Sequence, residues 1–195
     1  MTQPLSERSV AEQTRDWVER VVIGLNLCPF AKAVHAKAQI RYVVSQSESR
    51  PALLLQLGQE LLGLAAADPE QIETTLLIVP RMLQDFLDYN DFLGEADAKL
   101  VELELEGELQ IASFHPDYCF ADAAPKDPAN YTNRSPYPTL HMLREASVTR
   151  AIDAFPEPSS IYARNMQVLR ALEPQGLALL FPRAHHSSKP PGRDA

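Results

Sequence analysis

The residues best suited to chemistry are concentrated in one part of the chain, residues 113–145. This segment contains two His, one Cys, two Arg, three Tyr and two Asn, and much of it connects a predicted strand to a predicted helix. Loops longer than about 12–15 residues are uncommon in compact domains unless they have a function. Long loops held by rigid elements often carry binding or catalytic groups. The composition therefore indicates a site here, although it does not define a reaction.

Cys28 is the first candidate catalytic residue. It precedes Pro29, a residue type suited to the first position of a helix, so a short helix over 29–36 would have Cys28 as its N-cap. Unpaired N–H groups and the helix dipole at such a position favour the thiolate, and Lys32 adds positive charge. The alternative is a small apolar Cys packed between Leu27 and Phe30, because free Cys is often buried.

His115 is the second candidate catalytic residue. It follows a predicted strand over 108–114 and precedes Pro116, which favours an extended backbone at His115. Ligands of open α/β sheets bind beyond the carboxyl ends of the strands, which is where this His is expected. It would act there as a base, a ligand or a hydrogen-bond donor. The alternative is a His that anchors the loop through a backbone carbonyl.

Five further residues form a predicted substrate-binding set. Arg134 and Arg144 would hold an anion beside the N-terminal amides of a helix beginning at Pro138, with His141 on the same helical face as Arg144. Asn130 and Asn133 would orient the bound anion. A salt bridge of Arg144 that organises the loop is the competing interpretation.

No metal site is predicted, and no cofactor is assigned. Cys28, His115, Cys119 and His141 have the side chains that zinc prefers, but their spacing matches no recognised zinc pattern. The chain has only seven Gly and contains no Gly-rich loop of the kind that binds nucleotide phosphates.

Strands alternate with helices in the hydrophobic pattern, which predicts an α/β (or α+β) fold. We expect a small, mostly parallel βαβαβ sheet of about three strands, covered by about five helices. The strands are expected at 39–45, 74–79 and 108–114. The helices are expected at 10–23, 29–36, 51–68, 81–104, 138–154 and 159–172.

Composition and charge narrow the class of protein. We expect a single globular domain over 1–181 and a disordered tail over 182–195, which is polar and Pro-rich. The net charge of −8 argues against nucleic-acid or anionic-membrane partners. Apolar runs are far shorter than the ~20 residues that span a bilayer, and the N-terminus has no signal-peptide pattern. These features favour a cytoplasmic protein.

Four motifs in order resemble the bacterial family catalogued as domain of unknown function 1415. They lie at 26–31 (NLCPFA), 85–93 (DFLDYNDFL), 113–116 (SFHP) and 130–141 (NYTNRSPYPTLH), and the likeness covers about 13–172. The resemblance implies a cytoplasmic bacterial protein. It supplies no mechanism and no catalytic residues, and the family pattern does not require Cys at position 119.

These observations lead to one main hypothesis of function and two alternatives. The main hypothesis is a small enzyme that acts on a small anionic metabolite in a pocket built by residues 113–145 and Cys28, by thiol- or His-assisted hydrolysis or transfer. The first alternative is a non-catalytic module that binds a small ligand or a protein. The second is a metal-binding protein.

Overall fold

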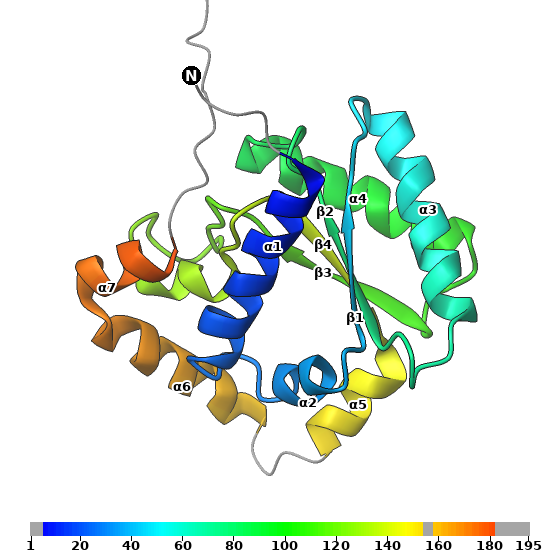
Figure 1. Cartoon of the computed structure of the whole chain (residues 1–195). Helices are drawn as coiled ribbons and strands as arrows, with labels where there is room; N and C mark the ends of the chain where they lie inside the picture. Colours follow the sequence, from blue (N-terminus) through cyan, green and yellow to red (C-terminus); the bar gives the residue numbers. More distant parts are fainter. Residues whose placement is uncertain (1–5, 154–157, 182–195) are drawn as a thin grey trace, which may run out of the picture.

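The computed structural model describes residues 6–153 and 158–181, which form a four-stranded mixed sheet with helices on both faces (Figure 1). The strands are β1 (Ile40–Val44), β2 (Thr74–Ile78), β3 (Leu109–Phe114) and β4 (Thr139–Arg144). The helices are α1 (Glu7–Trp17), the π-helix η1 (Val18–Ile23), α2 (Ala31–Ala36), α3 (Arg50–Ala66), α4 (Phe86–Glu102), the 3-10 helix η2 (Pro128–Asn133), α5 (Glu145–Asp153), α6 (Pro158–Ala171) and α7 (Glu173–Leu180).

The sheet has the strand order β1-β2-β4-β3 and is not mostly parallel. β1 and β2 are parallel, but β4 is antiparallel to both of its neighbours. The α/β class is therefore confirmed, whereas the prediction of about three mostly parallel strands is wrong. The predicted tail over 182–195 lies outside the described residues.

The error has one source, because residues 139–144 form strand β4 and not the first turns of a helix. Leu140, Met142 and Leu143 are compatible with either structure in isolation. In the fold this segment lies between β2 and β3 and pairs with both along its length. Such tertiary pairing overrides a local helical signal. The helix predicted from Pro138 begins only at Glu145, as α5.

The two faces of the sheet have separate hydrophobic cores. Side chains alternate along a strand, so Leu77, Leu140 and Met142 pack against α3 and α4 on one face. On the opposite face, Leu76 and Ile78 pack in a second core with residues of α1, η1, α6 and α7. Helices α2 and α5 lie near the lower end of the sheet in Figure 1.

The N-terminal helix is divided into an α-helical and a π-helical part. The sequence predicts one helix over 10–23, and the structure shows α1 followed by η1. At the end of η1 the carbonyl oxygen of Arg20 approaches Gly24 so closely that a Cβ atom at position 24 would clash with it. π-Helical segments are rare and often occur at functional sites.

Helix α4 also begins later than predicted. The helix expected from residue 81 begins at Phe86, because the Asp85 side chain accepts hydrogen bonds from the backbone N–H groups of Leu87 and Asp88 and forms the N-cap. Leu83 in the preceding turn has a positive φ of 57°.

Among the described residues, no helix combines the length and the apolar character needed to cross a membrane.

Candidate functional site

A cavity with an almost entirely apolar lining lies on the face of the sheet that carries α1, and we call it the sheet-face cavity. Its volume is about 360 Å³. All four strands contribute to its floor, through Ile40, Thr74, Leu76, Gln110, Ala112, Phe114, His141 and Leu143. Its walls come from α1, η1, α2 and α5 and include Trp17, Val18, Val22, Cys28, Phe30, Val34, Val148, Ala151 and Ile152.

His141 is held in one orientation by the hydroxyl group of Thr74. The Thr74 hydroxyl oxygen lies 2.6 Å from the backbone carbonyl oxygen of Met142, which can only accept a hydrogen bond. The single hydroxyl hydrogen therefore goes to Met142. The same Thr74 oxygen lies 2.7 Å from Nε2 of His141 and must accept the hydrogen of that nitrogen. Nε2 of His141 therefore carries a hydrogen, and in the neutral ring this is its one N–H.

This tautomer leaves Nδ1 of His141 as an unprotonated acceptor. Nδ1 makes no hydrogen bond to any residue that the structure describes. Burial lowers the pKa of His141 to about 4, so the ring stays neutral at physiological pH. The cavity floor therefore contains a fixed, uncharged hydrogen-bond acceptor without a partner.

Gln110 supplies a second polar group to the apolar floor. In the register of the sheet, Gln110 lies opposite Leu143, and Ala112 lies opposite His141. The partly buried Gln110 side chain makes no hydrogen bond to other described residues. An amide both donates and accepts, so Gln110 and His141 together offer one donor group, the NH₂ of Gln110, and two acceptor atoms to a bound molecule.

Cys28 lines the same cavity, but it is not a helix N-cap. Helix α2 begins at Ala31, after a turn in which the Ala31 N–H donates to the Cys28 carbonyl oxygen at 3.2 Å. Phe30 occupies the N-cap position. The predicted N-cap geometry is therefore wrong, and the argument for a dipole-stabilised thiolate no longer applies. The thiol is free and partly exposed.

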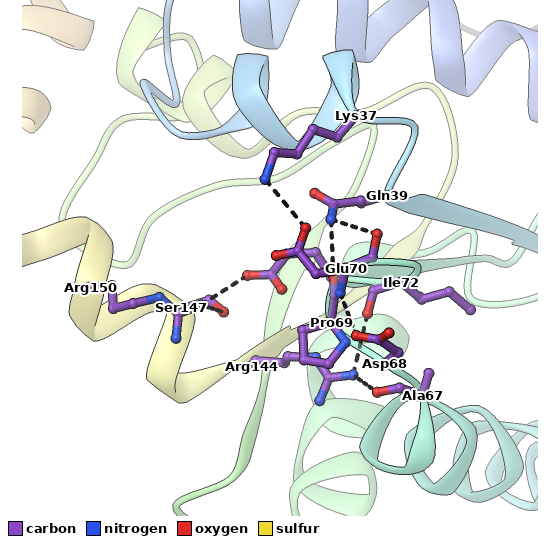
Figure 2. Close-up of polar contacts among 11 residues, drawn as sticks. Lys37, Gln39, Ala67, Asp68, Pro69, Glu70, Ile72, Arg144, Ser147 and Arg150 are labelled. Atoms are coloured by element: carbon purple, nitrogen blue, oxygen red, sulfur yellow. Dashed lines mark hydrogen bonds and ion pairs between the residues drawn. The ribbon is translucent and has the colours of Figure 1, made fainter.

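Helix α5 forms one wall of the cavity, and an ion pair of its last turn links it to the residue before β2. None of its residues is fully buried, and its apolar side chains Val148, Ala151 and Ile152 line the cavity. Figure 2 shows the polar contacts that hold this end of the sheet, where Arg150 pairs with Glu73 at 3.6 Å. These contacts fix α5 relative to the turn that leads into β2.

Arg144, at the end of β4, ties the same region to α3 (Figure 2). Its Nη2 donates to the carbonyl oxygens of Leu64 at 2.6 Å, Ala67 at 2.7 Å and Ile72 at 3.3 Å. The C-terminal carbonyls of a helix lack intrahelical donors, so a buried guanidinium satisfies them. Arg144 and His141 do not share a helical face, since both are on β4. Arg144 borders the sheet-face cavity, and its guanidinium group caps α3.

His115 is fully buried and both of its ring nitrogens have partners. Nδ1 accepts from the Asp117 N–H at 3.0 Å, so Nε2 carries the hydrogen and donates to the Leu83 carbonyl oxygen at 3.0 Å. Burial lowers its pKa, and the ring packs against Phe86 and Tyr89. This geometry is that of the loop-anchoring alternative. His115 borders none of the cavities described here, so it does not meet Cys28 and Arg144 there.

Asn130, Asn133 and Arg134, which were predicted to bind substrate, instead make hydrogen bonds that hold the 116–138 loop in place. Asn130 is buried, accepts from the Phe120 N–H and donates to the Ala124 carbonyl oxygen. Asn133 donates to the Ser113 carbonyl oxygen. Arg134 lines a smaller cavity on the far side of Trp17, which Arg144 does not reach. The two arginines therefore do not form one anion clamp.

Two cavity residues, Thr74 and Gln110, were not among the sequence-predicted site residues. Both lie on correctly predicted strands, so the alternation pattern could have assigned each to a face. It could not show that both residues flank the strand of His141, because that requires β4 to be recognised as a strand. Among the described residues, no group of three His, Cys, Asp or Glu side chains could hold a metal ion.

The chain belongs to the family described as "Protein of unknown function (DUF1415)", whose model matches residues 9–178. The family resemblance predicted from the four motifs is thereby confirmed. No match was found among curated proteins or solved structures. Family membership therefore carries no activity over to this chain.

Proposed function

We propose that the protein binds a small, mainly apolar molecule in the sheet-face cavity and hydrogen-bonds a donor group of that molecule through Nδ1 of His141. The observation that carries this proposal is the fixed tautomer of His141, which presents a free acceptor in an apolar surrounding. A polar group in such a surrounding is costly unless it is hydrogen-bonded. A ligand hydroxyl, amine or thiol would supply the missing bond.

The rest of the cavity agrees with a ligand of this kind. Small-molecule pockets are mostly apolar, contain a few converging polar groups and have volumes of about 300–1,000 Å³. The volume of about 360 Å³ is at the lower end of that range. Trp17, Phe114 and Val148 would contact the apolar body of the ligand, and Gln110 would contact its polar end.

The anionic ligand expected from Arg134 and Arg144 is not part of the proposal for this cavity. The Arg144 guanidinium group is engaged by the backbone carbonyls of Leu64 and Ala67 at the end of α3 and of Ile72 before β2. Arg134 borders a different cavity. A neutral ligand with one donor group fits the free groups better.

The binding test uses p-cresol and toluene, which differ by one hydroxyl group. We expect p-cresol to stabilise the fold, by about 2.7 kcal/mol at a hundredfold excess over its Kd, and toluene to bind more weakly. The variant His141→Phe should bind the two compounds equally, and Ala151→Phe, which fills the cavity, should bind neither. Thermal unfolding and calorimetric titration measure both effects. If p-cresol gives no shift, or retains its advantage in His141→Phe, the proposal fails.

An enzymatic role is the second candidate, and it is favoured by the presence of Cys28 and His141 in the same cavity. The thiol proton would move to Nδ1 of His141, and the thiolate would form a bond to the carbonyl carbon of an ester or thioester substrate. The alcohol or thiol of that substrate would leave with the proton from His141, and water would then release the acyl group from Cys28 as a carboxylic acid. A pKa of about 4 makes His141 a weak base in the empty cavity, so binding ranks ahead of catalysis.

Alkylation of Cys28 distinguishes the two roles. If His141 accepts the thiol proton, iodoacetamide should label Cys28 at pH 7 several-fold faster in the wild type than in His141→Gln. Cys119, whose Sγ contacts the carbonyl oxygens of Phe120 and Ala123, serves as the internal standard in the same sample. Equal rates for Cys28 in the two proteins would exclude the catalytic pair and leave the binding role intact.

A further inference from the structure

A second, smaller cavity lies on the other side of Trp17, between η1, the 131–136 segment and α7. Its volume is about 190 Å³, below the range of drug-sized pockets. We call it the Arg20–Arg134 groove, and Asp16, Trp17, Arg20, Arg134, Leu180 and Phe181 are the lining residues that matter here. Trp17 lines both cavities, whereas Cys28, Gln110 and His141 of the sheet-face cavity do not line this groove.

Arg134 is held in position by its own loop. Its Nε donates to the Tyr118 carbonyl oxygen at 3.3 Å, and its Nη2 donates to the Pro125 carbonyl oxygen at 3.2 Å. The guanidinium carbon lies 4.2 Å from the centre of the Tyr131 ring. These contacts leave Nη1 without a partner and the positive charge without a carboxylate, within the described chain. A guanidinium group that is already ordered loses little entropy when it binds an anion.

Arg20 adds a second positive charge to the groove, and Asp16 adds a negative charge. They are four residues apart, but Asp16 is on α1 and Arg20 is on the π-helix η1, so the α-helical i, i+4 pairing geometry does not apply to them. Neither forms an ion pair or a side-chain hydrogen bond with another described residue. The groove therefore combines two unpaired cations and one unpaired carboxylate with the apolar surfaces of Trp17, Leu180 and Phe181.

We infer that the Arg20–Arg134 groove binds a zwitterionic α-amino acid with an apolar side chain. The carboxylate of the ligand would pair with Arg20 and Arg134, and its ammonium group with Asp16. The side chain would lie against Trp17 and α7. A dianion such as phosphate is a poorer match, because Asp16 would repel it.

Trp17 allows this inference to be tested directly, because it is the only Trp of the chain and lines the groove. The probe is L-leucine, compared with 4-methylpentanoate, which lacks the ammonium group, and 3-methylbutylamine, which lacks the carboxylate. We expect L-leucine to give a saturable change in Trp17 fluorescence. Each single-charge analogue should bind at least about tenfold more weakly, since hydrogen bonds to charged groups contribute substantially to affinity.

Four variants separate the groove from the rest of the molecule. Arg20→Gln and Asp16→Asn, both at exposed positions, should each weaken L-leucine binding at least about tenfold. Arg8→Gln, an exposed position on the same helix outside the groove, should bind like the wild type. Ala151→Phe, which fills the sheet-face cavity, should also leave L-leucine binding unchanged.

The inference is overturned if L-leucine and L-phenylalanine both give no saturable signal. It is also overturned if 4-methylpentanoate binds as tightly as L-leucine, or if Arg20→Gln and Asp16→Asn bind like Arg8→Gln. None of these results bears on p-cresol binding in the sheet-face cavity, so failure of one proposal is distinguishable from failure of the other.

Discussion

At the scale of single residues, the hydroxyl group of Thr74 determines what His141 offers to a ligand. By donating to the Met142 carbonyl and accepting from Nε2, it fixes which ring nitrogen stays free. The neighbouring Thr75 has the same side chain and is also buried, but its hydroxyl group has no hydrogen-bond partner among the described residues. Adjacent positions of one strand therefore provide a matched pair of threonines.

Replacing Thr74 by valine should lower the stability of the fold, whereas replacing Thr75 by valine should not. Thr74→Val leaves the His141 Nε2–H without an acceptor and should lower the free energy of unfolding by about 1–3 kcal/mol. Thr75→Val removes an unsatisfied buried hydroxyl group and should be neutral or stabilising. Chemical denaturation of the two variants measures the difference. Equal losses of stability would show that the Thr74 hydroxyl does not hold His141.

At the scale of elements, η1 separates the two cavities. Val18 and Val22 line the sheet-face cavity, whereas Arg20 and Val21 line the Arg20–Arg134 groove. The residues of η1 thus face two different sites. Gly24 permits this conformation, because any larger residue would meet the Arg20 carbonyl oxygen.

Gly24→Ala should therefore destabilise the fold by about 1–3 kcal/mol, the usual cost of forcing an atom into a packed site, and should alter Trp17 fluorescence. Gly63→Ala is the matched control, since position 63 is exposed on α3 and a Cβ atom there meets nothing within 4 Å. That substitution should stabilise the protein by about 0.8–1.0 kcal/mol through helix propensity. A neutral Gly24→Ala would contradict the role assigned to the π-helix.

At the scale of the whole molecule, the local patterns predict the elements better than their assembly. The β-branched run at 74–79 and the alternation at 108–114 correspond to β2 and β3, and Ser49 and Asp85 cap α3 and α4 as expected for such residues. β4 could not be predicted, because its pairing with two distant strands decides its conformation. Because β4 was not predicted, neither the strand order of the sheet nor the neighbours of His141 could be predicted.

Only part of the candidate site could be predicted, again because contacts between residues distant in the sequence decide the rest. Cys28 and His141 line the sheet-face cavity, but His115 and Arg144 are used to anchor a loop and a helix end. Both have partners that are backbone carbonyls far away in the sequence, and such carbonyls leave no trace in the residue pattern. Residue type alone therefore cannot separate a buried structural His from one that faces a cavity.

The most direct test of the central claim is the nitrogen NMR spectrum of the His141 ring, assigned by comparison with His141→Gln. We predict a neutral ring with hydrogen on Nε2 at pH 7, and a midpoint near the pKa of about 4, well below the ordinary value of 6.5. Because the folded-state pKa is lowered, protonation of His141 destabilises the fold as the pH falls below 6.5, and the penalty is complete below the folded-state pKa. Saturating p-cresol at pH 7 should shift the Nδ1 resonance and leave Nε2 nearly unchanged. Hydrogen on Nδ1, or an Nδ1 resonance that p-cresol does not move, would contradict the account.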